Sequence, residues 1–343
     1  MRICFFAKVP SADILDTVNF YAQDIRVLKD LGHDVVTATR FREIPTDCDL
    51  YFVWWWSWAF LPYFRARVRR KPMVITGVYD YSSERIPGIG RPWWKRQILR
   101  SMLHRADANV FVSTYEMQLV ARLFGAPNAW YIPCTVDTER YRPGLQPRQR
   151  FLLNVAWSGA TNGRRKCLRE IIEAMPAILS KHPDTRLLMA GRQGEYHQTL
   201  VDTAKSLHVE HAIDFLGVIS EETKVQLMQT CAAYLQPTLL EGFGLAIAEA
   251  IACEAPVITN PQGAVPEVVG PGAILLERPE PSLIAAAATR LLDDREFAAD
   301  MGRKGRQHVL EHFTYPVRRD GLAKVIDHVT SARETSTIAH QPS

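Results

Sequence analysis

Two glutamates and two glycines lie close together in the segment 237–270, PTLLEGFGLAIAEAIACEAPVITNPQGAVPEVVG. Glu241 directly precedes Gly242, Gly244 follows shortly after, and seven residues separate Glu241 from Glu249. Glycines at the start of a helix allow backbone N–H groups to approach an anion, which the helix dipole also attracts. A carboxylate inside that helix can accept hydrogen bonds from vicinal hydroxyls, as acidic residues do with ribose. The pattern therefore indicates a nucleotide site, and a solvated helix face is the alternative explanation of the two glutamates.

Short apolar runs alternate with helical patterns in the first half of the chain. Residues 2–7 predict a strand, apolar residues spaced by three or four predict a helix that ends at Gly32, and VVTAT predicts the next strand. Such a βαβ unit is right-handed and its two strands are parallel. The runs LYFVWW, MVITGV, NVFVS and AWYI continue the alternation, so we expect a doubly wound sheet that ends near Tyr131.

A second alternation follows a break in this pattern. The segment 141–150, YRPGLQPRQR, predicts a linker, and strands and helices alternate again from FLLNVAW to AILLE. We therefore expect the α/β class with two doubly wound domains, 1–145 and 150–315, and a disordered tail at 331–343. Open α/β sheets bind ligands at the carboxyl ends of their strands, so the expected site is a cleft between the domains.

Composition excludes several classes of protein. The 343 residues, of which 47% are hydrophobic and 23% charged, suffice for about two folded domains. The six cysteines lack CxxC or zinc-like spacing, which favours a reduced, cytoplasmic setting. The N-terminus does not have the pattern of a signal peptide, and no window of about 20 residues stays apolar enough to span a bilayer. GxGxxG is missing after the first strand, which argues against a nicotinamide dehydrogenase, and no nucleic-acid-binding motif accompanies the basic residues.

The segment 237–270 as a whole resembles the donor-site motif of glycosyltransferase family 4, the retaining GT-B enzymes that use nucleotide-diphosphate sugars. That family has Ser-x-x-Glu-Gly-Phe-Gly, a second glutamate, Gly-x-Pro-Val and Pro-Glu-Val. Here Thr238 replaces the serine and Glu254 replaces the glycine before Pro-Val, and the last motif is matched by Pro266, Glu267 and Val268. MAGRQGE, FLG, IPCTVDTERYRP and MGRKGRQHVLEHFTY also match, so the resemblance covers about residues 2–328.

The resemblance implies a GT-B fold, in which an acceptor-binding and a donor-binding Rossmann-like domain face each other and a helix at 316–330 returns to the first domain. Glu241 would contact hydroxyls of the donor sugar, Glu249 would hold the ribose, and Lys166 would neutralise the diphosphate leaving group. The other matching donor-binding positions are Gly191, Gly242, Phe243, Gly244 and Leu245. Because cations replace a Lewis-acid metal in such enzymes, the resemblance implies neither a metal nor a cofactor.

Two loops depart from the family's pattern. The family's arginine six positions before Lys166 is replaced by Ala160, so the charge would have to come from one of two neighbours, Arg164 or Arg165. The first loop, KVPSADIL, lacks the family's glycines, and this departure puts the standard acceptor geometry in question.

A third departure lies after the fourth strand, in VITGVYDYSSE. Tyr79 or Asp80 occupies the place of a family histidine near the transferring sugar. A tyrosine hydroxyl can hydrogen-bond sugar hydroxyls, and an aspartate can accept the acceptor's proton. An aspartate in a turn after a strand is the alternative explanation of Asp80. The family's reaction proceeds on one face of the sugar, with the leaving phosphate helping to deprotonate the acceptor, so transfer does not require this histidine.

The segment 49–64, DLYFVWWWSWAFLPYF, is rich in aromatic residues, and residues 51–105 hold eleven Arg and Lys against two acids, a net charge of +9. If the strand continues through the tryptophans, the side chains of Trp54 and Trp56 point to one face of the sheet and that of Trp55 to the other. The resemblance places three tryptophans on the acceptor side of the cleft: Trp55, Trp56 and Trp58. Three explanations compete: core packing beside a solvated basic face, binding of a lipid-linked acceptor or an anionic membrane, and stacking of indoles on sugar rings.

The leading function is a retaining glycosyltransferase that transfers a hexose-type sugar from a UDP-, GDP- or related donor to a hydroxyl of a glycan, glycolipid or small aglycone. A sugar-nucleotide epimerase of the same fold and a degenerate protein that binds sugar nucleotide or glycan without turnover are the alternatives. The expected partners are therefore a nucleotide-sugar donor and a glycan, lipid-linked or small-molecule acceptor, and no nucleic acid. The expected location is the cytoplasm, with contact to the inner, anionic face of a membrane as an option.

Overall fold

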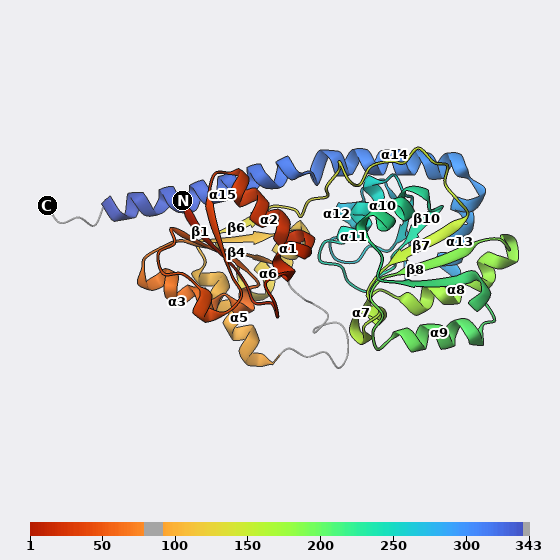
Figure 1. Ribbon diagram of the computed structural model, residues 1–343, viewed down its shortest axis with the longest axis horizontal. Helices are drawn as coiled ribbons and strands as arrows, with labels where there is room; N and C mark the ends of the chain where they lie inside the picture. The colour runs from red at the N-terminus through yellow and green to blue at the C-terminus, as the bar shows by residue number, and fades with distance from the viewer. Residues whose placement is uncertain (79–91, 339–343) are drawn as a thin grey trace. The chain divides into compact units, whose positions relative to one another are not determined.

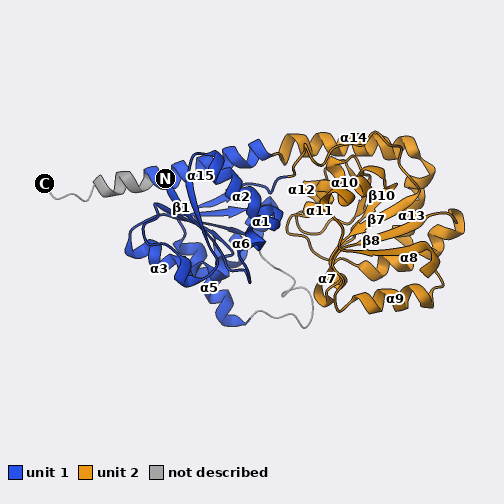
Figure 2. Ribbon diagram, in the orientation of Figure 1, with its two compact units in different colours: residues 1–135, 315–343 blue, residues 136–314 orange. Residues whose placement is uncertain are grey.

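The computed structural model describes residues 1–78 and 92–338, with side chains as far as Ser331. The chain divides into two compact units, coloured blue and orange in Figure 2. Unit 1 comprises Met1–Thr135 and Tyr315–Ser343, and unit 2 comprises Val136–Thr314. Each unit is an alternation of strands and helices around one parallel sheet (Figure 1).

A six-stranded sheet forms the centre of unit 1, with the order β2-β1-β3-β4-β5-β6 and parallel pairing throughout. Its apolar runs form central strands because helices cover both faces of the sheet, so four of these strands are buried along almost their whole length. The strands are β1 (Arg2–Ala7), β2 (Asp34–Ala38), β3 (Leu50–Trp54), β4 (Met73–Gly77), β5 (Ala108–Phe111) and β6 (Ala129–Tyr131).

The helices of unit 1 pack on the two faces of this sheet. Apolar residues of α2 (Asn19–Asp30) and α15 (Tyr315–Ile338) join strand residues in one core on the first face. The turn η2 (Trp56–Trp58) packs against helices of the second face. The other helical elements are α1 (Ile14–Thr17), η1 (Phe41–Glu43), α3 (Phe60–Val68), α5 (Trp93–Arg105) and α6 (Thr114–Phe124).

Unit 2 repeats this architecture around a second six-stranded sheet, with the order β12-β11-β10-β7-β8-β9. All its strand pairs are parallel as well. The two sheets confirm the predicted α/β class with two doubly wound domains. The strands are β7 (Phe151–Val155), β8 (Arg186–Ala190), β9 (Ile213–Gly217), β10 (Ala233–Leu235), β11 (Val257–Thr259) and β12 (Ala273–Leu275).

The helices of unit 2 also form two layers (Figure 1). On one face α8 (Leu168–Lys181) packs against α13 (Pro281–Asp293), and their apolar residues share a core with the strands. On the other face α11 (Leu245–Ala252) packs against α14 (Arg295–His312). The remaining helical elements are α7 (Ala160–Arg165), α9 (His197–Ser206), η3 (Glu210–Ala212), α10 (Glu221–Thr230) and α12 (Val265–Val269).

The unit boundaries differ in position from those expected from the sequence. The chain passes into unit 2 at Val136, so the proline- and arginine-rich segment 141–150 lies within unit 2. Helix α15 extends to Ile338, whereas the sequence predicted disorder from Ser331 onward. The polar residues of this last stretch have no apolar periodicity, and they continue a helix whose earlier turns are anchored in the core of unit 1.

A buried ion pair anchors α15 to unit 1. Arg318 is 1% exposed, and its guanidinium pairs with the carboxylate of Asp24, which is itself fully buried. Arg318 Nη2 lies 2.8 Å from Asp24 Oδ2, and Nη1 donates to the carbonyl oxygens of Ile132 at 3.0 Å and Pro133 at 2.9 Å. Burial alone would lower the pKa of Arg318, but Asp24 outweighs it and raises that pKa. The guanidinium therefore stays charged in the interior, because its donors meet a carboxylate and backbone oxygens.

The three consecutive tryptophans do not all belong to the strand. β3 ends at Trp54, and Trp55 has a φ of 80°, a conformation that turns the chain into η2. Trp54 Nε1 donates to Asp24 Oδ2 at 3.0 Å, Trp55 Nε1 donates to the Tyr21 hydroxyl at 2.6 Å, and the indole N–H of Trp56 is also bonded. The simple alternation of faces expected for a continuing strand therefore ends at Trp54.

Candidate active site

The segment 241–244, here called the glycine loop, leads into α11. Gly244 stands before the first turn of α11 with a φ of 92°, in the left-handed region that favours glycine, and Leu245 is the first helical residue. The carbonyl oxygen of Glu241 accepts a hydrogen bond from the Ala264 N–H at 2.9 Å. The Phe243 ring, which is 5% exposed, packs edge-on against Phe313 with the ring centroids 5.3 Å apart. Backbone and ring contacts thus fix the loop before any ligand binds.

Glu241 lies in a buried cluster of opposite charges. Its carboxylate forms an ion pair with Arg165, Lys166 Nζ lies 3.8 Å from Glu241 Oε1, and the side chain of Glu241 is 8% exposed. Gln236 Nε2 also approaches Glu241 Oε1 at 3.4 Å. Burial alone would raise the pKa of Glu241, but Lys166 and Arg165 together outweigh it and lower that pKa. Glu241 is therefore a carboxylate at neutral pH, although it is almost shielded from solvent.

The two cations of the cluster come from the end of α7. Arg165 donates to the Leu240 carbonyl oxygen and, through Nη2, to Asn162 Oδ1 at 2.8 Å. Arg164 is exposed, so Arg165 is the arginine that the structure brings to Glu241. Burial lowers the pKa of Lys166, Glu241 raises it and Arg165 lowers it further, with a net result below the usual value. The turn that ends α7 thus brings Arg165 to Glu241 and leaves Arg164 at the surface, and which of them replaces the family arginine stays a prediction.

Three polar residues support this cluster, Gln236, Thr238 and Asn260, and the sequence analysis singled out only Thr238. Thr238 N–H donates to Asn260 Oδ1, and Asn260 Nδ2 donates to the Thr238 carbonyl oxygen, both at 2.7 Å. Gln236 Oε1 accepts a hydrogen bond from the Tyr234 hydroxyl at 2.7 Å. All three positions lie at the carboxyl ends of β10 and β11. Polar residues that directly follow two buried strands are the signal that would have found them.

Glu249 lies on α11, and its partner comes from a helix far away in sequence. Lys224 Nζ lies 3.1 Å from Glu249 Oε2 and 2.9 Å from Glu221 Oε1, while the Tyr141 hydroxyl donates to Glu221 Oε2. Burial lowers the pKa of Lys224, but the two carboxylates more than offset it and raise that pKa. Sequence reasoning missed Lys224, because only the packing of α10 beside α11 brings it to Glu249.

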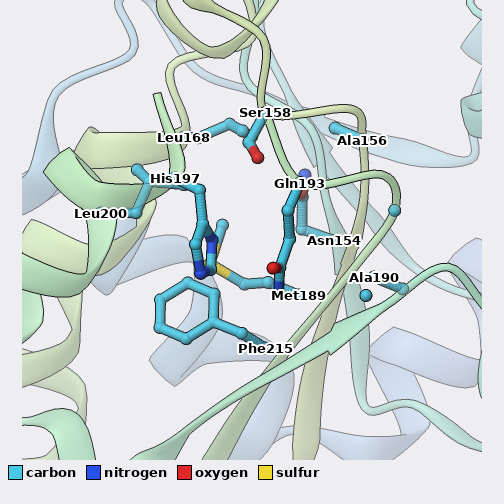
Figure 3. Close-up of a pocket in the computed structure, with 12 residues that line it drawn as sticks. Asn154, Ala156, Ser158, Leu168, Met189, Ala190, Gln193, His197, Leu200 and Phe215 are labelled. Atoms are coloured by element: carbon cyan, nitrogen blue, oxygen red, sulfur yellow. The ribbon is translucent and has the colours of Figure 1, made fainter. Parts of the chain in front are cut away.

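Beyond the cluster, a small cavity lies where β7, β8 and β9 end. Figure 3 shows it between Ser158, Gln193 and His197, with Phe215 below, and its volume is about 20 Å³. Gly191 lines it with a φ of 131°, and a Cβ there would lie 2.2 Å from the Ala156 carbonyl oxygen, so only glycine fits. Ligand pockets usually measure about 300–1,000 Å³, so this cavity alone does not hold a nucleotide.

The acceptor-side positions divide into buried and exposed residues of unit 1. Trp56 is 2% exposed, its Nε1 donates to Asn109 Oδ1 at 2.9 Å, and its ring stacks on Phe111 at 5.1 Å. The structure thus places Trp56 in the core and not on a surface that an acceptor could contact. Trp55 is half-buried and Trp58 is 38% exposed. Tyr79 and Asp80 lie outside the described residues.

Two family models match this chain. The family described as "Glycosyl transferases group 1" matches residues 153–308, and "Glycosyltransferase Family 4" matches residues 5–140. The chain belongs to the group 1 glycosyltransferases of family 4. The residues of the charged cluster all lie within the first match, and the tryptophans of the segment 49–64 lie within the second. The resemblance that the sequence motifs indicated is therefore confirmed, and the protein is an enzyme of the glycosyltransferase class.

Relatives of this glycosyltransferase include mannosyltransferases. A GDP-mannose-dependent monoacylated alpha-(1-6)-phosphatidylinositol monomannoside mannosyltransferase of Corynebacterium glutamicum is 25% identical, over 84% of this chain and 80% of the relative. A GDP-mannose-dependent alpha-(1-6)-phosphatidylinositol monomannoside mannosyltransferase of Mycolicibacterium smegmatis is 28% identical, over 87% of this chain and 81% of the relative. Both matches span most of the two proteins compared.

Solved structures show which fold the glycosyltransferase has. HepE of Anabaena, in complex with UDP and glucose, gives a TM-score of 0.77 at 17% identity, over 95% of this chain and 99% of HepE. Sucrose-phosphate synthase from Thermosynechococcus elongatus gives a TM-score of 0.77 at 17% identity, over 96% of this chain and 99% of that chain. The glycosyltransferase therefore has the GT-B fold with two Rossmann-like domains.

The described residues contain neither a cluster of metal ligands nor a membrane-spanning helix. Within residues 1–78 and 92–338, no three His, Cys, Asp or Glu side chains gather as metal ligands would. No helix in the same part of the glycosyltransferase is long and apolar enough to cross a bilayer.

Proposed function

We propose that this glycosyltransferase transfers a hexose from a nucleotide-diphosphate sugar with retention of anomeric configuration. The observation that supports this proposal most directly is the convergence of Glu241 with Lys166 and Arg165, which come from two separate segments of unit 2. Two cations face one carboxylate in a nearly dry setting, where electrostatic interactions are stronger than in water. The excess positive charge suits a diphosphate, and the carboxylate suits sugar hydroxyls.

The proposed reaction exchanges one bond at the sugar's C1 for another. The bond from C1 to the diphosphate oxygen breaks, its electron pair stays on the diphosphate, and the acceptor oxygen forms a bond to C1 on the same face. Lys166 and Arg165 stabilise the charge that grows on the leaving group, and Arg165 takes the part of the family arginine replaced by Ala160. The leaving phosphate accepts the proton of the acceptor hydroxyl.

The remaining donor contacts are proposed from the geometry of the glycine loop and α11. Glu241 accepts hydrogen bonds from hydroxyls of the donor sugar, and the backbone from Gly242 to Leu245 lies around the sugar and the diphosphate. Glu249 holds the ribose, and Lys224 orients the Glu249 carboxylate through their ion pair. We also propose that transfer needs no metal, because Lys166 and Arg165 supply the positive charge that a Lewis acid would otherwise provide.

The relatives support a finer choice of donor and acceptor. Both mannosyltransferases named above depend on GDP-mannose and act on phosphatidylinositol mannosides. We propose that this enzyme transfers mannose from GDP-mannose to a lipid-linked glycan, on the cytoplasmic face of an anionic membrane. On the acceptor side we assign Trp55, Trp58 and, from the sequence alone, Tyr79 and Asp80.

A thermal-shift titration tests the donor first. GDP-mannose, GDP, UDP-glucose and UDP are added to the purified protein, and the melting temperature is measured. A donor at 100 times its dissociation constant stabilises the protein by about 2.7 kcal/mol, and we expect GDP-mannose to give the largest shift. If no nucleotide changed the melting temperature, the donor site would be contradicted.

Product analysis then tests the reaction. We expect an α-mannoside from GDP-mannose when a mannosylated phosphatidylinositol is present, identified by the anomeric signal in NMR spectra. Lys166→Met should lose transfer, whereas Lys181→Met, an exposed lysine of the same unit, serves as the matched control. Conversion of the sugar nucleotide without any acceptor would instead identify an epimerase, and an inverted product would contradict retention.

A further inference from the structure

A hollow opens between α3 and α5 on the surface of unit 1. Its volume is about 580 Å³, and both helices contribute side chains to it. The apolar part of its lining comes from aromatic residues of α3 and aliphatic residues of α5, and Gln97, Ser101 and Arg105 contribute the polar part. The apolar residues are Phe60, Tyr63, Phe64, Ile98 and Met102. Most of the lining is thus apolar, although the hollow is open to solvent.

The segments that contain the two helices of this hollow carry charge of one sign. Within residues 51–78 and 92–105 there is no aspartate or glutamate, whereas there are nine lysines and arginines. Lys71 pairs with Asp49, and Arg105 bonds to Ser101 on its own helix. The nine are Arg65, Arg67, Arg69, Arg70, Lys71, Lys95, Arg96, Arg100 and Arg105. The chain therefore gathers positive charge here far beyond its overall formal charge of +4.

Large apolar side chains stand exposed among these cations. Trp93 is 75% exposed, Phe64 is 60% exposed and Val68 is 82% exposed, in contrast to the buried Trp54 and Trp56. Trp94 is 47% exposed, and Lys95 Nζ lies 5.4 Å from the centre of its ring. Large apolar side chains exposed on the two helices that share this hollow indicate an interaction site, because burial of apolar surface is favourable.

We infer that the α3–α5 surface binds an anionic phospholipid bilayer. Tryptophan and other aromatic rings favour the headgroup boundary, where one part of the ring is dry and another is wet. Lysines and arginines are attracted to the negative surface potential of phosphatidylglycerol- or phosphatidylinositol-type lipids. The exposed Phe64 and Trp93 insert at this boundary, the hollow between the helices receives the apolar part of a lipid, and Arg67 and Arg100 contact phosphates.

The charge and the exposed apolar side chains of this surface disfavour a second copy of the chain and a nucleic acid as its partner. A second copy of the same surface would bring nine like charges against nine, so pairing between two copies is unfavourable. A nucleic acid would satisfy the arginines but would leave without an apolar partner both Phe64, which lines the hollow, and Val68, which is exposed on the same helix. A bilayer satisfies both the charges and the apolar side chains.

Membrane binding would bring the enzyme to a lipid-linked acceptor. The inference rests on the proposed function in this one respect. The donor site lies in unit 2, whereas α3 and α5 belong to unit 1. Membrane binding and donor binding are therefore measured separately, and each can fail while the other succeeds.

Vesicle flotation tests the inference. The full-length protein is mixed with vesicles of phosphatidylcholine alone or with 30% phosphatidylglycerol, at 50 and at 500 mM salt. We expect flotation with the anionic vesicles at low salt, a loss of more than tenfold in the partition coefficient at high salt, and little flotation with phosphatidylcholine. A protein that stays in solution with anionic vesicles at 50 mM salt would overturn the inference, whatever GDP-mannose does to the melting temperature.

Charge-reversal variants locate the surface. Arg67→Glu combined with Arg100→Glu should reduce the partition coefficient more than tenfold. The matched control combines Arg295→Glu with Lys324→Glu, two exposed residues away from α3 and α5, with the same change of net charge. Equal losses in both double variants would overturn the assignment to this surface. Melting temperatures and the thermal shift with GDP-mannose, measured for all variants, show that unit 1 is folded and that the donor site is intact.

Aromatic variants separate a bilayer from a soluble polyanion. Phe64→Ser combined with Trp93→Ser removes apolar side chains that are already exposed, so folding is preserved. We expect a loss of vesicle binding of about tenfold and no change in retention on heparin. If this double variant bound anionic vesicles as well as the wild type, the contact would be electrostatic alone and the insertion of aromatic rings would be contradicted.

Discussion

The segments 49–64 and 237–270 are the two most unusual stretches of this chain, and the structure uses them in different ways. In the first, each of three consecutive indole N–H groups finds a partner inside unit 1. In the second, a buried carboxylate at Glu241 faces cations that come from another segment. The aromatic segment thus satisfies its own polar groups within the fold, whereas the charged cluster keeps an excess of positive charge.

The difference shows that an unusual composition can reflect core packing, whereas a specific motif of charged residues points to a site. Tryptophans pack a core because their rings are large, and a core also requires that each indole N–H be bonded, which Asp24, Tyr21 and Asn109 achieve here. A glutamate beside a lysine and an arginine adds little to packing, and burial of its charge is costly unless it is paired. We therefore expect changes at the buried tryptophans to affect folding and changes at the charged cluster to affect transfer.

We expect the largest effect on stability at the buried ion pair between Arg318 and Asp24. Arg318→Met leaves the Asp24 carboxylate buried without its cationic partner, and we expect a loss of about 3–5 kcal/mol in the free energy of unfolding of unit 1. Urea titration followed by tryptophan fluorescence measures it. The control is Arg319→Met at the exposed neighbouring position, which should change stability by about 0.5 kcal/mol or less. Similar losses in both variants would show that the buried pair has no special role.

Replacement of the carboxylate in unit 2 gives the second effect. Glu241→Gln keeps the shape of the side chain but removes its charge, and we expect the barrier to transfer to rise by about 2–4 kcal/mol. The far-ultraviolet circular dichroism spectrum and the unfolding midpoint of unit 1 should stay as they are. Steady-state kinetics with GDP-mannose measure the effect, and Glu277→Gln, exposed in the same unit, is the control. Wild-type turnover of Glu241→Gln would contradict the proposed site.

Much of this architecture could be predicted from local patterns, because strands buried on both faces are short apolar runs and amphipathic helices repeat every three or four residues. The glycine loop could also be predicted, since its glutamates and glycines are adjacent in sequence. Lys224 could not, because it meets Glu249 only through the packing of two helices. The end of β3 could not either: Trp55 has a positive φ that no propensity of tryptophan indicates.

The third effect concerns a single indole N–H. Trp56→Phe keeps most of the ring stacked on Phe111 but leaves Asn109 Oδ1 without its donor in the core. An unsatisfied buried acceptor costs about 1–3 kcal/mol, so we expect a loss of that size in the free energy of unfolding of unit 1. Trp58→Phe, at a position that is 38% exposed, should change it by about 0.5 kcal/mol or less. Equal stabilities of the two variants would place Trp56 outside the core.

A fourth, smaller effect concerns the C-terminal end of α11, where the family has a glycine. Glu254 has a φ of 58° two residues after the end of α11, where the resemblance expects glycine. A non-glycine residue in this left-handed region costs about 1 kcal/mol, so Glu254→Gly should raise the free energy of unfolding of unit 2 by roughly that amount. Glu254→Ala keeps the Cβ and serves as the control. A destabilised glycine variant would show that the glutamate side chain contributes more than its backbone costs.

The smallest effect is the pH dependence that arises from Lys166. As the pH rises, its contribution to stability increases while the affinity for GDP-mannose falls. Burial, together with Arg165, lowers the pKa of Lys166 below 10.5 despite the nearby Glu241. Between this lowered pKa and 10.5 the unfolded chain binds the additional proton, so the Lys166 contribution to stability increases as the pH rises through that window. Over the same window the amine loses its charge, and the affinity for GDP-mannose should fall about twofold where half of the molecules are deprotonated. Isothermal titration calorimetry at several alkaline pH values measures this. Lys166→Arg, which stays charged, should abolish the pH dependence, and an unchanged alkaline slope in that variant would place the titrating group elsewhere.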